Sequence, residues 1–377
     1  MHVVDITMFY AAEGGGVSTY LNAKARWLAG RERIRHTIVS PNPHAGGTAD
    51  QAGIPSLALP GIHGYRMPRS VGAAAGVLRA LRPDLVEAGD AGPCAWAALK
   101  AARQLQIPAV AFYHSDLPQL MRNRFGALAA GAAKRHLAQL YRRFDLVLAP
   151  SKMMAQKLEA MGVAGALHQP LGIDTDVFCP QRRDAALRAQ LGLPDDARLL
   201  LYAGRFTAEK KLGLLTDAVR RLGRPYHLLL VGGGAAPPRC AYTSVIPFQR
   251  DQRVLAGLIA SCDLLVHPGD CETFGLVVLE AMACGLPVVG TSAGGVAELV
   301  DEATGILVPP NSAAGLAEGI EAIYRRDRGA LAANARRKAC DGYDWNRIMP
   351  QLLRRYAGLL ASHQRLVLET EAAYVAG

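Results

Sequence analysis

The chain has 377 residues, half of them hydrophobic, which is too long for one ordinary core and suits two domains. No run of about 18 apolar residues offers a membrane span, and Met1 to Asp5 leads straight into a strand without a signal peptide. Seven cysteines without a Cys-x-x-Cys pair argue against a disulfide framework or a zinc site, and they favour a reducing cytoplasm.

The formal net charge of +10 is concentrated in the first half of the chain. Residues 1–180 carry 19 Lys and Arg against 12 Asp and Glu, whereas residues 181–377 carry 23 against 20. A basic half is compatible with nucleic acid, an anionic membrane surface or acidic substrates. Nucleic acid is the weakest of these partners, because no aromatic-interleaved basic stripe, helix-turn-helix signature or zinc-finger spacing is present.

Apolar runs of strand length alternate with helical patterns along the whole chain, which is typical of parallel α/β sheets. Strands are expected at residues 3–7, 36–40, 84–87, 109–113, 146–149, 199–203, 227–231, 264–266 and 287–290. We therefore expect two doubly wound, Rossmann-like domains facing a central cleft, where ligands bind at the carboxyl ends of the strands.

The domain limits follow from a segment without periodicity. Residues 171–180, bounded by prolines, are expected to link a domain of residues 1–170 to one of residues 181–345. The segment from Trp345 to about Leu368 has the apolar spacing of a helix.

In the first half of the chain, two segments that follow predicted strands are candidate binding positions. Gly14-Gly15-Gly16 precedes a helical pattern and can bring backbone N–H groups close to a phosphate, although such a run alone is more often a flexible turn. His114 follows a central strand, where a lone His is usually structural. Asp116 is open to two interpretations, a general base or the cap of the next helix.

The second half opens with basic residues directly after its first strand. Arg205 offers a planar fork for phosphate oxygens and Lys210 a movable charge, whereas Lys211 is best explained as a solvated residue.

The most specific stretch contains Glu272 and Glu280. An apolar strand and a turn precede it, and a helix from about Phe274 is expected to end at Gly285. A carboxylate in an apolar helix should not be buried unpaired. Glu280 is therefore either bonded to a neighbouring strand or, like Glu272, an acceptor for ligand hydroxyls beside an anion-favouring helix N-terminus. Hydroxyls plus phosphate describe a nucleotide sugar.

Phe274-Gly275-Leu276 lies between the two glutamates, and Glu280 opens the run Glu-Ala-Met-Ala-Cys-Gly-Leu-Pro-Val-Val. This pattern resembles the retaining glycosyltransferases of family 4. The resemblance covers nearly the whole chain and implies the GT-B fold, with the C-terminal helix, residues 346–377, crossing back to the first domain. It also implies a UDP- or GDP-linked hexose donor seated mainly on the second domain.

The resemblance assigns roles to several residues. Glu280 is expected to hold the ribose hydroxyls and Glu272 the hexose hydroxyls. Arg205 and Lys210 match the pyrophosphate-binding pair, and the catalytic group is completed by Glu272 and His114, the latter facing the donor sugar. The remaining donor-binding positions are Gly15, Gly16, Phe248, Arg250, Phe274, Gly275 and Leu276, of which Phe248 and Arg250 lie where the family holds the base. Lys211 replaces the glycine that commonly follows the pyrophosphate lysine.

The sequence argues against a metal or another cofactor. No Asp-x-Asp pair stands at a strand end, so phosphate charge must be met by Arg205, Lys210 and backbone N–H groups. With no protein nucleophile evident, the resemblance implies retention by front-face attack. A glycan phosphorylase, a nucleotide-sugar 2-epimerase and a silent sugar-binding protein are the alternative classes.

The acceptor is suggested by the segment after His114. Apolar residues recur there at helical spacing among basic residues: Leu120, Met121, Phe125, Leu128, Arg122, Arg124, Lys134 and Arg135. Such a segment is either an ordinary helix pair or a surface that rests on an anionic bilayer. The resemblance slightly favours a membrane lipid or glycolipid acceptor, with the protein peripheral at the inner face of the membrane. A soluble sugar or growing polysaccharide is the alternative acceptor.

Overall fold

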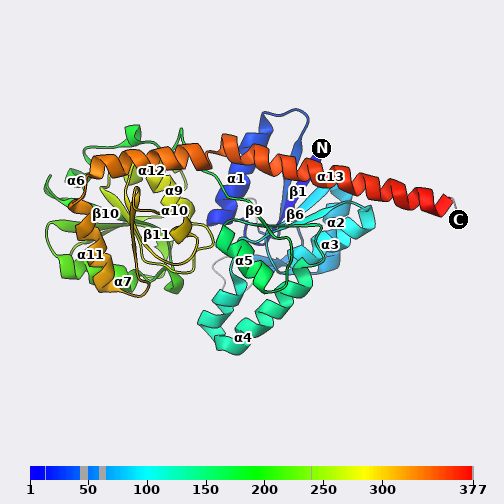
Figure 1. Cartoon of the computed structure of the whole chain (residues 1–377), viewed down its shortest axis with the longest axis horizontal. Helices are drawn as coiled ribbons and strands as arrows, with labels where there is room; N and C mark the ends of the chain where they lie inside the picture. Colours follow the sequence, from blue (N-terminus) through cyan, green and yellow to red (C-terminus); the bar gives the residue numbers. More distant parts are fainter. Residues whose placement is uncertain (13, 43–49, 59–64, 239, 376–377) are drawn as a thin grey trace. The chain divides into compact units, whose positions relative to one another are not determined.

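The structure, a computed structural model, describes residues 1–12, 14–42, 50–58, 65–238 and 240–375. The chain divides into two compact units, Met1–Pro170 together with the residues from Asn346 onward, and Leu171–Trp345. Each unit contains a main parallel sheet flanked by helices (Figure 1).

The first unit is built on a parallel sheet with the strand order β3-β2-β1-β6-β7-β8-β9. Its strands are β1 (His2–Ile6), β2 (Arg35–Ser40), β3 (Asp50–Gly53), β6 (Leu85–Ala88), β7 (Ala109–Phe112), β8 (Leu146–Ala149) and β9 (Leu167–His168). The apolar runs predicted as strands are confirmed to within a residue or two, and their side chains are buried on both faces, as in other parallel sheets. The short edge strands β3 and β9 lack such runs and were not predicted.

Helices connect the strands of this unit, and three of them begin at short polar residues. The helices are α1 (Gly16–Ala29), α2 (Val71–Leu81), α3 (Pro93–Leu105), α4 (Leu117–Tyr141) and α5 (Lys152–Ala160), and a small antiparallel pair, β4 (Ser56–Ala58) and β5 (Arg66–Pro68), precedes α2. Ser70, Asp116 and Ser151 accept from backbone N–H groups at the starts of α2, α4 and α5, which satisfies donors that the helix itself cannot.

Helix α4 consists of two arms that meet at Gly126, whose φ of 83° breaks the helical geometry. Leu137 and Tyr141 of the second arm join the core of the first unit. In contrast, Leu120, Phe125 and Leu128 are 39%, 60% and 92% exposed. Figure 1 shows the two arms leading away from the sheet of this unit and back. The apolar spacing predicted from the sequence therefore belongs to the core only in the second arm.

The second unit is built on a parallel sheet with the order β12-β11-β10-β13-β14-β15. Its strands are β10 (Arg198–Phe206), β11 (Tyr226–Gly234), β12 (Thr243–Pro247), β13 (Leu264–His267), β14 (Val288–Thr291) and β15 (Gly305–Val308). Its helices are η1 (Pro180–Arg182), α6 (Leu187–Gln190), η2 (Ala208–Lys210), α7 (Leu212–Leu222), α8 (Gln252–Ala260), α9 (Leu276–Ala283), α10 (Val296–Leu299), α11 (Ala313–Tyr324) and α12 (Arg328–Tyr343). The four predicted strands are confirmed, so the chain has the predicted pair of doubly wound α/β sheets.

The segment predicted as a linker, residues 171–180, is grouped with the second unit. There the Ile173 N–H donates to the Tyr343 carbonyl at 2.8 Å, and the Trp345 N–H donates to the Ile173 carbonyl at 3.1 Å. Gly172 lies against the Trp345 ring: a Cβ on Gly172 would stand 2.6 Å from the nearest ring carbon. The last helix, α13 (Trp345–Val375), starts beside this segment and continues with residues of the first unit.

Candidate active site

The loop that carries Glu272 lies between the carboxyl end of β13 and the start of α9. Gly275, with φ of 103°, turns the chain into α9, a conformation that favours glycine. The Gly295 N–H donates to the Glu272 carbonyl at 2.7 Å, and the Thr291 hydroxyl donates to the Gly269 carbonyl at 2.8 Å. Since a Cβ on Gly295 would lie 2.7 Å from the Phe274 Cα, backbone packs directly on backbone here. The loop is thus fixed by the segment after β14.

Glu272 is surrounded by positive and hydrogen-bonding partners. Its carboxylate pairs with the Lys210 Nζ and lies 3.2 Å from the His267 Nε2. Burial acts to raise the pKa of Glu272, but the Lys210 charge and the His267 hydrogen bond outweigh it and hold the pKa well below its usual range. Glu272 is therefore an ionised acceptor. Its side chain remains 19% exposed, which leaves it accessible to a ligand.

Glu280 has a different environment within α9. The residue is 8% exposed, and over the described residues no hydrogen bond or ion pair reaches its carboxylate. Burial raises the pKa of Glu280 to about 7. The interpretation of Glu280 as a residue bonded to a neighbouring strand has no contact to support it. The carboxylate oxygens have no protein partner and are not fully enclosed, so a ligand can reach them and supply hydrogen bonds.

The basic residues of this site lie at the end of β10 and just after it. The Tyr202 hydroxyl donates to the Arg205 carbonyl at 3.0 Å, which fixes the backbone, while the Arg205 side chain is exposed. Lys210 ends the short helix η2 and reaches Glu272. Because β10 and β13 are neighbours in the parallel sheet, the structure brings Lys210 and Glu272 together at one sheet edge.

The predicted base-binding residues lie at the same edge, beyond β11 and β12. A Cβ on Gly232 would stand 1.9 Å from the Gly204 carbonyl oxygen, so β11 and β10 approach closely at their ends. A Cβ on Gly233 would lie 3.8 Å from the Phe248 Cβ, and Phe248 is 43% exposed. Arg250 is exposed in the loop after β12. Both side chains are accessible, as a base-binding role requires.

Among the residues between the two glutamates, Phe274 is buried. Its ring packs against Tyr343 with 6.0 Å between the ring centroids, so its side chain belongs to the core. Leu276, the first residue of α9, is half-buried. A contact of Phe274 or Gly275 with a donor would come from the backbone.

In the first unit, Gly15 and Gly16 form the start of α1. Gly15 is the N-cap and offers no side-chain bond, so the first N–H groups of this helix are open to a ligand. Position 14 has no room for a side chain, since a Cβ on Gly14 would lie 1.9 Å from the Ser18 Oγ.

His114 lies at the carboxyl end of β7. Its ring stacks on Phe112 at 4.3 Å and tilts against Tyr20 at 5.2 Å between centroids. Burial lowers the pKa of His114 to about 3, so the imidazole is neutral at physiological pH. Asp116 caps α4 through the Gln119 N–H and pairs with Lys157 at 2.8 Å, which favours the cap over the general base.

A buried charge network in the first unit was missed from the sequence. Lys24 of α1 donates to Asp5 at 2.8 Å and to the Tyr356 hydroxyl at 2.9 Å, and it lies 3.4 Å from Glu87. Tyr356 of α13 and Tyr20 both donate to Glu87. The signal was present, because Asp5 and Glu87 stand inside otherwise apolar strand runs.

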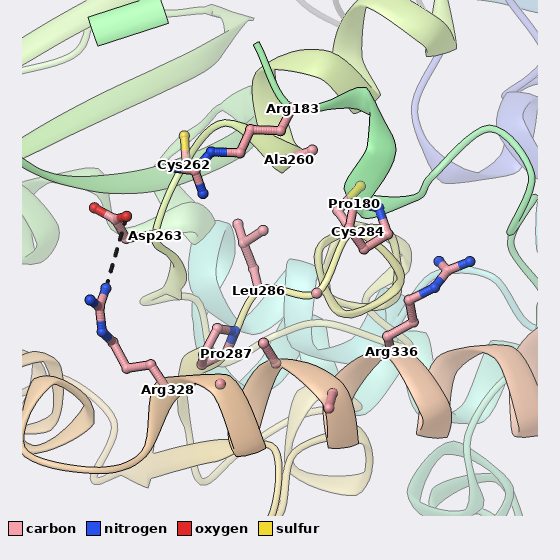
Figure 2. Close-up of a pocket in the computed structure, with 14 residues that line it drawn as sticks. Pro180, Arg183, Ala260, Cys262, Asp263, Cys284, Leu286, Pro287, Arg328 and Arg336 are labelled. Atoms are coloured by element: carbon pink, nitrogen blue, oxygen red, sulfur yellow. Dashed lines mark ion pairs between the residues drawn. The ribbon is translucent and has the colours of Figure 1, made fainter. Parts of the chain in front are cut away.

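A separate cavity of about 360 Å³ lies in the second unit at the amino ends of β13 and β14 (Figure 2). Cys262, Asp263, Leu286 and Pro287 line it together with Arg328 and Arg336 of α12. This is the edge of the sheet opposite to Glu272, and none of the predicted site residues lines the cavity. In the part of the chain that the structure describes, no cluster of three or more His, Cys, Asp or Glu side chains could hold a metal ion.

Two family models match this chain, one mainly in each unit. Residues 14–177 match the family model described as Glycosyltransferase Family 4, and residues 197–326 match the model described as Glycosyl transferases group 1. A GDP-mannose-dependent alpha-mannosyltransferase of Mycobacterium tuberculosis is 32% identical over 308 residues, which cover 78% of this chain and 76% of the relative. A GDP-mannose-dependent alpha-(1-6)-phosphatidylinositol dimannoside mannosyltransferase of the same species is 28% identical, over 96% of this chain and 97% of the relative.

A solved structure agrees with the fold. Sucrose-phosphate synthase from Thermosynechococcus elongatus has a TM-score of 0.81 at 22% identity and covers 96% of this chain and 100% of its own. Such identity carries the fold alone, which is the predicted GT-B type. The two family models and the mannosyltransferase relative together show that this chain belongs to glycosyltransferase family 4.

Proposed function

We propose that this glycosyltransferase transfers a hexose with retention from a nucleotide diphosphate sugar, with GDP-mannose the first donor to test, to a lipid-linked acceptor. The observation that carries the proposal is the buried, unpartnered Glu280 carboxylate beside the paired Glu272. The two mannosyltransferase relatives reported above are named as GDP-mannose-dependent, and one of them is named as a phosphatidylinositol dimannoside mannosyltransferase.

The two glutamates are assigned to the two sugars of the donor. Glu280 accepts hydrogen bonds from the ribose hydroxyls, which supply the partners that its burial requires. Glu272, ionised and partly accessible, accepts from the hexose hydroxyls. Phe248 and Arg250 contact the base at the ends of β11 and β12.

The leaving diphosphate is assigned to the basic residues. Arg205 offers two parallel N–H groups, Lys210 exchanges Glu272 for a phosphate oxygen, and the backbone from Gly275 to Leu276 starts the adjacent helix α9. Negative charge develops on the diphosphate as the glycosidic bond breaks, so these groups stabilise the transition state more than the ground state. The transfer is proposed to need no metal.

In the first unit, His114 and the start of α1 are assigned to the reacting sugar and the donor phosphates. A neutral imidazole can accept from or donate to a hydroxyl but brings no charge to the reacting centre. Without a protein nucleophile among these groups, retention would proceed by front-face attack, in which the leaving phosphate helps to deprotonate the acceptor hydroxyl.

The junction of the two arms of α4, on either side of Gly126, supports a lipid acceptor. Phe125 and Leu128 are exposed beside Arg122 and Arg124, which places apolar and cationic side chains on one short segment. Apolar side chains enter the boundary of a bilayer, and each nearby basic residue adds about 1 kcal/mol at an anionic surface. No helix in the described part of the chain is long and apolar enough to cross a membrane.

The donor assignment is tested by thermal unfolding with GDP-mannose, UDP-glucose and their free nucleotides, followed by an assay of nucleotide release with phosphatidylinositol mannosides as acceptors. A ligand at 100 times its Kd adds about 2.7 kcal/mol to stability. Turnover with GDP-mannose supports the proposal. Conversion of the donor to an epimer without any acceptor would replace it with the epimerase alternative.

The membrane contact is tested by co-sedimentation with anionic and neutral vesicles at 0.1 M and 1 M salt. Because the Debye length shortens from about 10 Å to 3 Å over this range, binding to anionic vesicles should weaken. Phe125→Ser with Leu128→Ser should reduce it further. Leu57→Ser, at a site 53% exposed in the same unit, is the control. Equal binding to neutral and anionic vesicles, or none, would favour a soluble sugar acceptor.

A further inference from the structure

Two consecutive lysines after β10 pair with two carboxylates of the loop after β13. Lys210 pairs with Glu272, and Lys211 pairs with Asp270. The Lys211 Nζ also lies 2.6 Å from the Asn311 Oδ1. The side chains of Lys211 and Asp270 are each 20% exposed, so this is a half-buried pair rather than a solvated one. The prediction of Lys211 as a solvated residue is wrong.

Lys211 occupies a backbone conformation that costs energy. Its φ is 54° and its ψ is 40°, and Asn311 has a φ of 63°. A left-handed conformation is unfavourable for a residue with a Cβ, and Asn tolerates it better than Lys. A glycine would remove the cost at position 211. Residues held in such conformations persist where their surroundings require them, and they cluster at functional sites.

The contacts of Lys211 tie three loops that leave the same edge of the sheet. Lys211 follows β10, Asp270 follows β13 and Asn311 follows β15. Burial acts to raise the pKa of Asp270, but hydrogen bonds from Lys211 and Cys271 lower it below its ordinary value, so Asp270 is ionised at neutral pH. Asp270 is two residues before Glu272, and its tie therefore restrains the backbone that carries Glu272.

A bound donor would affect the Lys210–Glu272 pair and the Lys211–Asp270 pair differently. On the proposed function, the diphosphate attracts Lys210 away from Glu272, and the loop loses one of its two ionic ties when the sugar must be held. Lys211 retains its partners, because both of them lie outside the groups assigned to the donor. We infer that Lys211 is a positioning residue that holds the Glu272 loop in place while Lys210 exchanges Glu272 for the donor phosphate.

The test compares Lys211→Gly with Lys211→Met, each in the full chain. Glycine removes both the tie and the unfavourable backbone conformation, whereas methionine removes the tie and keeps the conformation. Both variants should lower kcat on the donor at least tenfold while the Kd for GDP changes less than threefold, because Lys211 contacts no phosphate. Thermal stability should be higher for Lys211→Gly than for Lys211→Met. Lys211→Arg should recover part of the lost kcat.

Two further measurements separate positioning from a general structural effect. In a Glu272→Gln background, Lys211→Gly should lower kcat by less than twofold, because the residue acts through Glu272. With GDP bound, amide hydrogen exchange across residues 268–275 should be faster in Lys211→Gly than in the parent protein. Lys338→Met removes a comparable ion pair, to Asp301 at 2.7 Å, and should change neither quantity.

The outcomes distinguish this inference from the proposed function. If the parent protein turns over no hexose donor, the proposed function fails, and hydrogen exchange with GDP still tests the tie. If the parent turns over a donor and Lys211→Gly keeps its kcat and exchange rates, the inference is overturned. A tenfold weaker Kd for GDP in both Lys211 variants would also overturn it, since Lys211 would then bind phosphate directly.

Discussion

Replacement of Glu280 by Gln should act in opposite directions on stability and on donor affinity. The folded pKa of about 7 exceeds the value of about 4.5 in the unfolded chain, so the folded state holds the proton more tightly. The contribution of Glu280 to stability is therefore most favourable below about pH 4.5, and it falls as pH rises through 7. The difference of two to three pKa units corresponds to about 3 kcal/mol lost by pH 8. Gln does not ionise, so Glu280→Gln should remove this loss.

Donor binding should respond to the same change with a weaker complex. Gln keeps the shape but replaces charge-assisted hydrogen bonds to the ribose by neutral ones, which weakens binding by roughly 1.5–3 kcal/mol, or about ten- to 150-fold. The affinity of the parent protein for GDP should rise with pH from 6 to 8 as Glu280 ionises, and that of Glu280→Gln should not.

The assays are thermal unfolding and calorimetric titration with GDP, both at pH 6 and pH 8. Glu318→Gln changes an exposed glutamate of α11 and is the control for a loss of charge alone. Glu280→Gln is expected to unfold at no lower temperature than the parent protein at pH 8 and to bind GDP more weakly. A variant that melts lower at both pH values while it binds GDP normally would refute it, because Glu280 would then be a structural residue.

Three more outcomes follow from named contacts. Arg205→Ala or Lys210→Ala should lower turnover by about 10²–10³ without unfolding the protein, as measured by initial rates and thermal unfolding, since on the proposed assignment each removes one contact to the developing charge. Tyr356→Phe should destabilise the protein by about 1–3 kcal/mol in denaturant titration, because the buried Glu87 loses a donor. With a pKa of about 3, His114 should add no inflection to the rate between pH 5 and 9. Its contribution to stability is complete above about pH 6.5 and declines below it, since only the unfolded chain gains a proton there.

The fold could be predicted from the sequence because parallel strands are buried on both faces. The runs from Val3 to Ile6 and from Leu264 to Val266 consist almost entirely of apolar residues. The segments between such runs have helical periodicity, which indicates that strands and helices alternate along the chain. The short strands β3 (Asp50–Gly53) and β12 (Thr243–Pro247) were not predicted. Both lie at the edge of their sheet with one neighbouring strand, and both carry polar residues, so their sequence resembles that of a loop.

The candidate site was only partly predictable. Glu272, Glu280, Arg205 and Lys210 stand at strand ends or in an apolar helix, where a charged residue already calls for an explanation. The pairing of Lys210 with Glu272 depends on strand order, since β10 and β13 are adjacent in the sheet although β11 and β12 lie between them in sequence. No spacing along the chain contains that information.

The proposed donor site already holds the charges that a donor would redistribute. Lys210 neutralises Glu272, burial raises the pKa of Glu280, and Arg205 is exposed. On the proposed assignment, a donor gives each group a new partner: phosphate for Arg205 and Lys210, hexose hydroxyls for Glu272, and ribose hydroxyls for Glu280. A nucleotide without its sugar would separate Lys210 from Glu272 and leave that carboxylate with the His267 contact but without its cationic partner. On this assignment the sugar nucleotide satisfies every one of these groups, so the site would favour the intact donor over the released nucleotide and thereby assist product release.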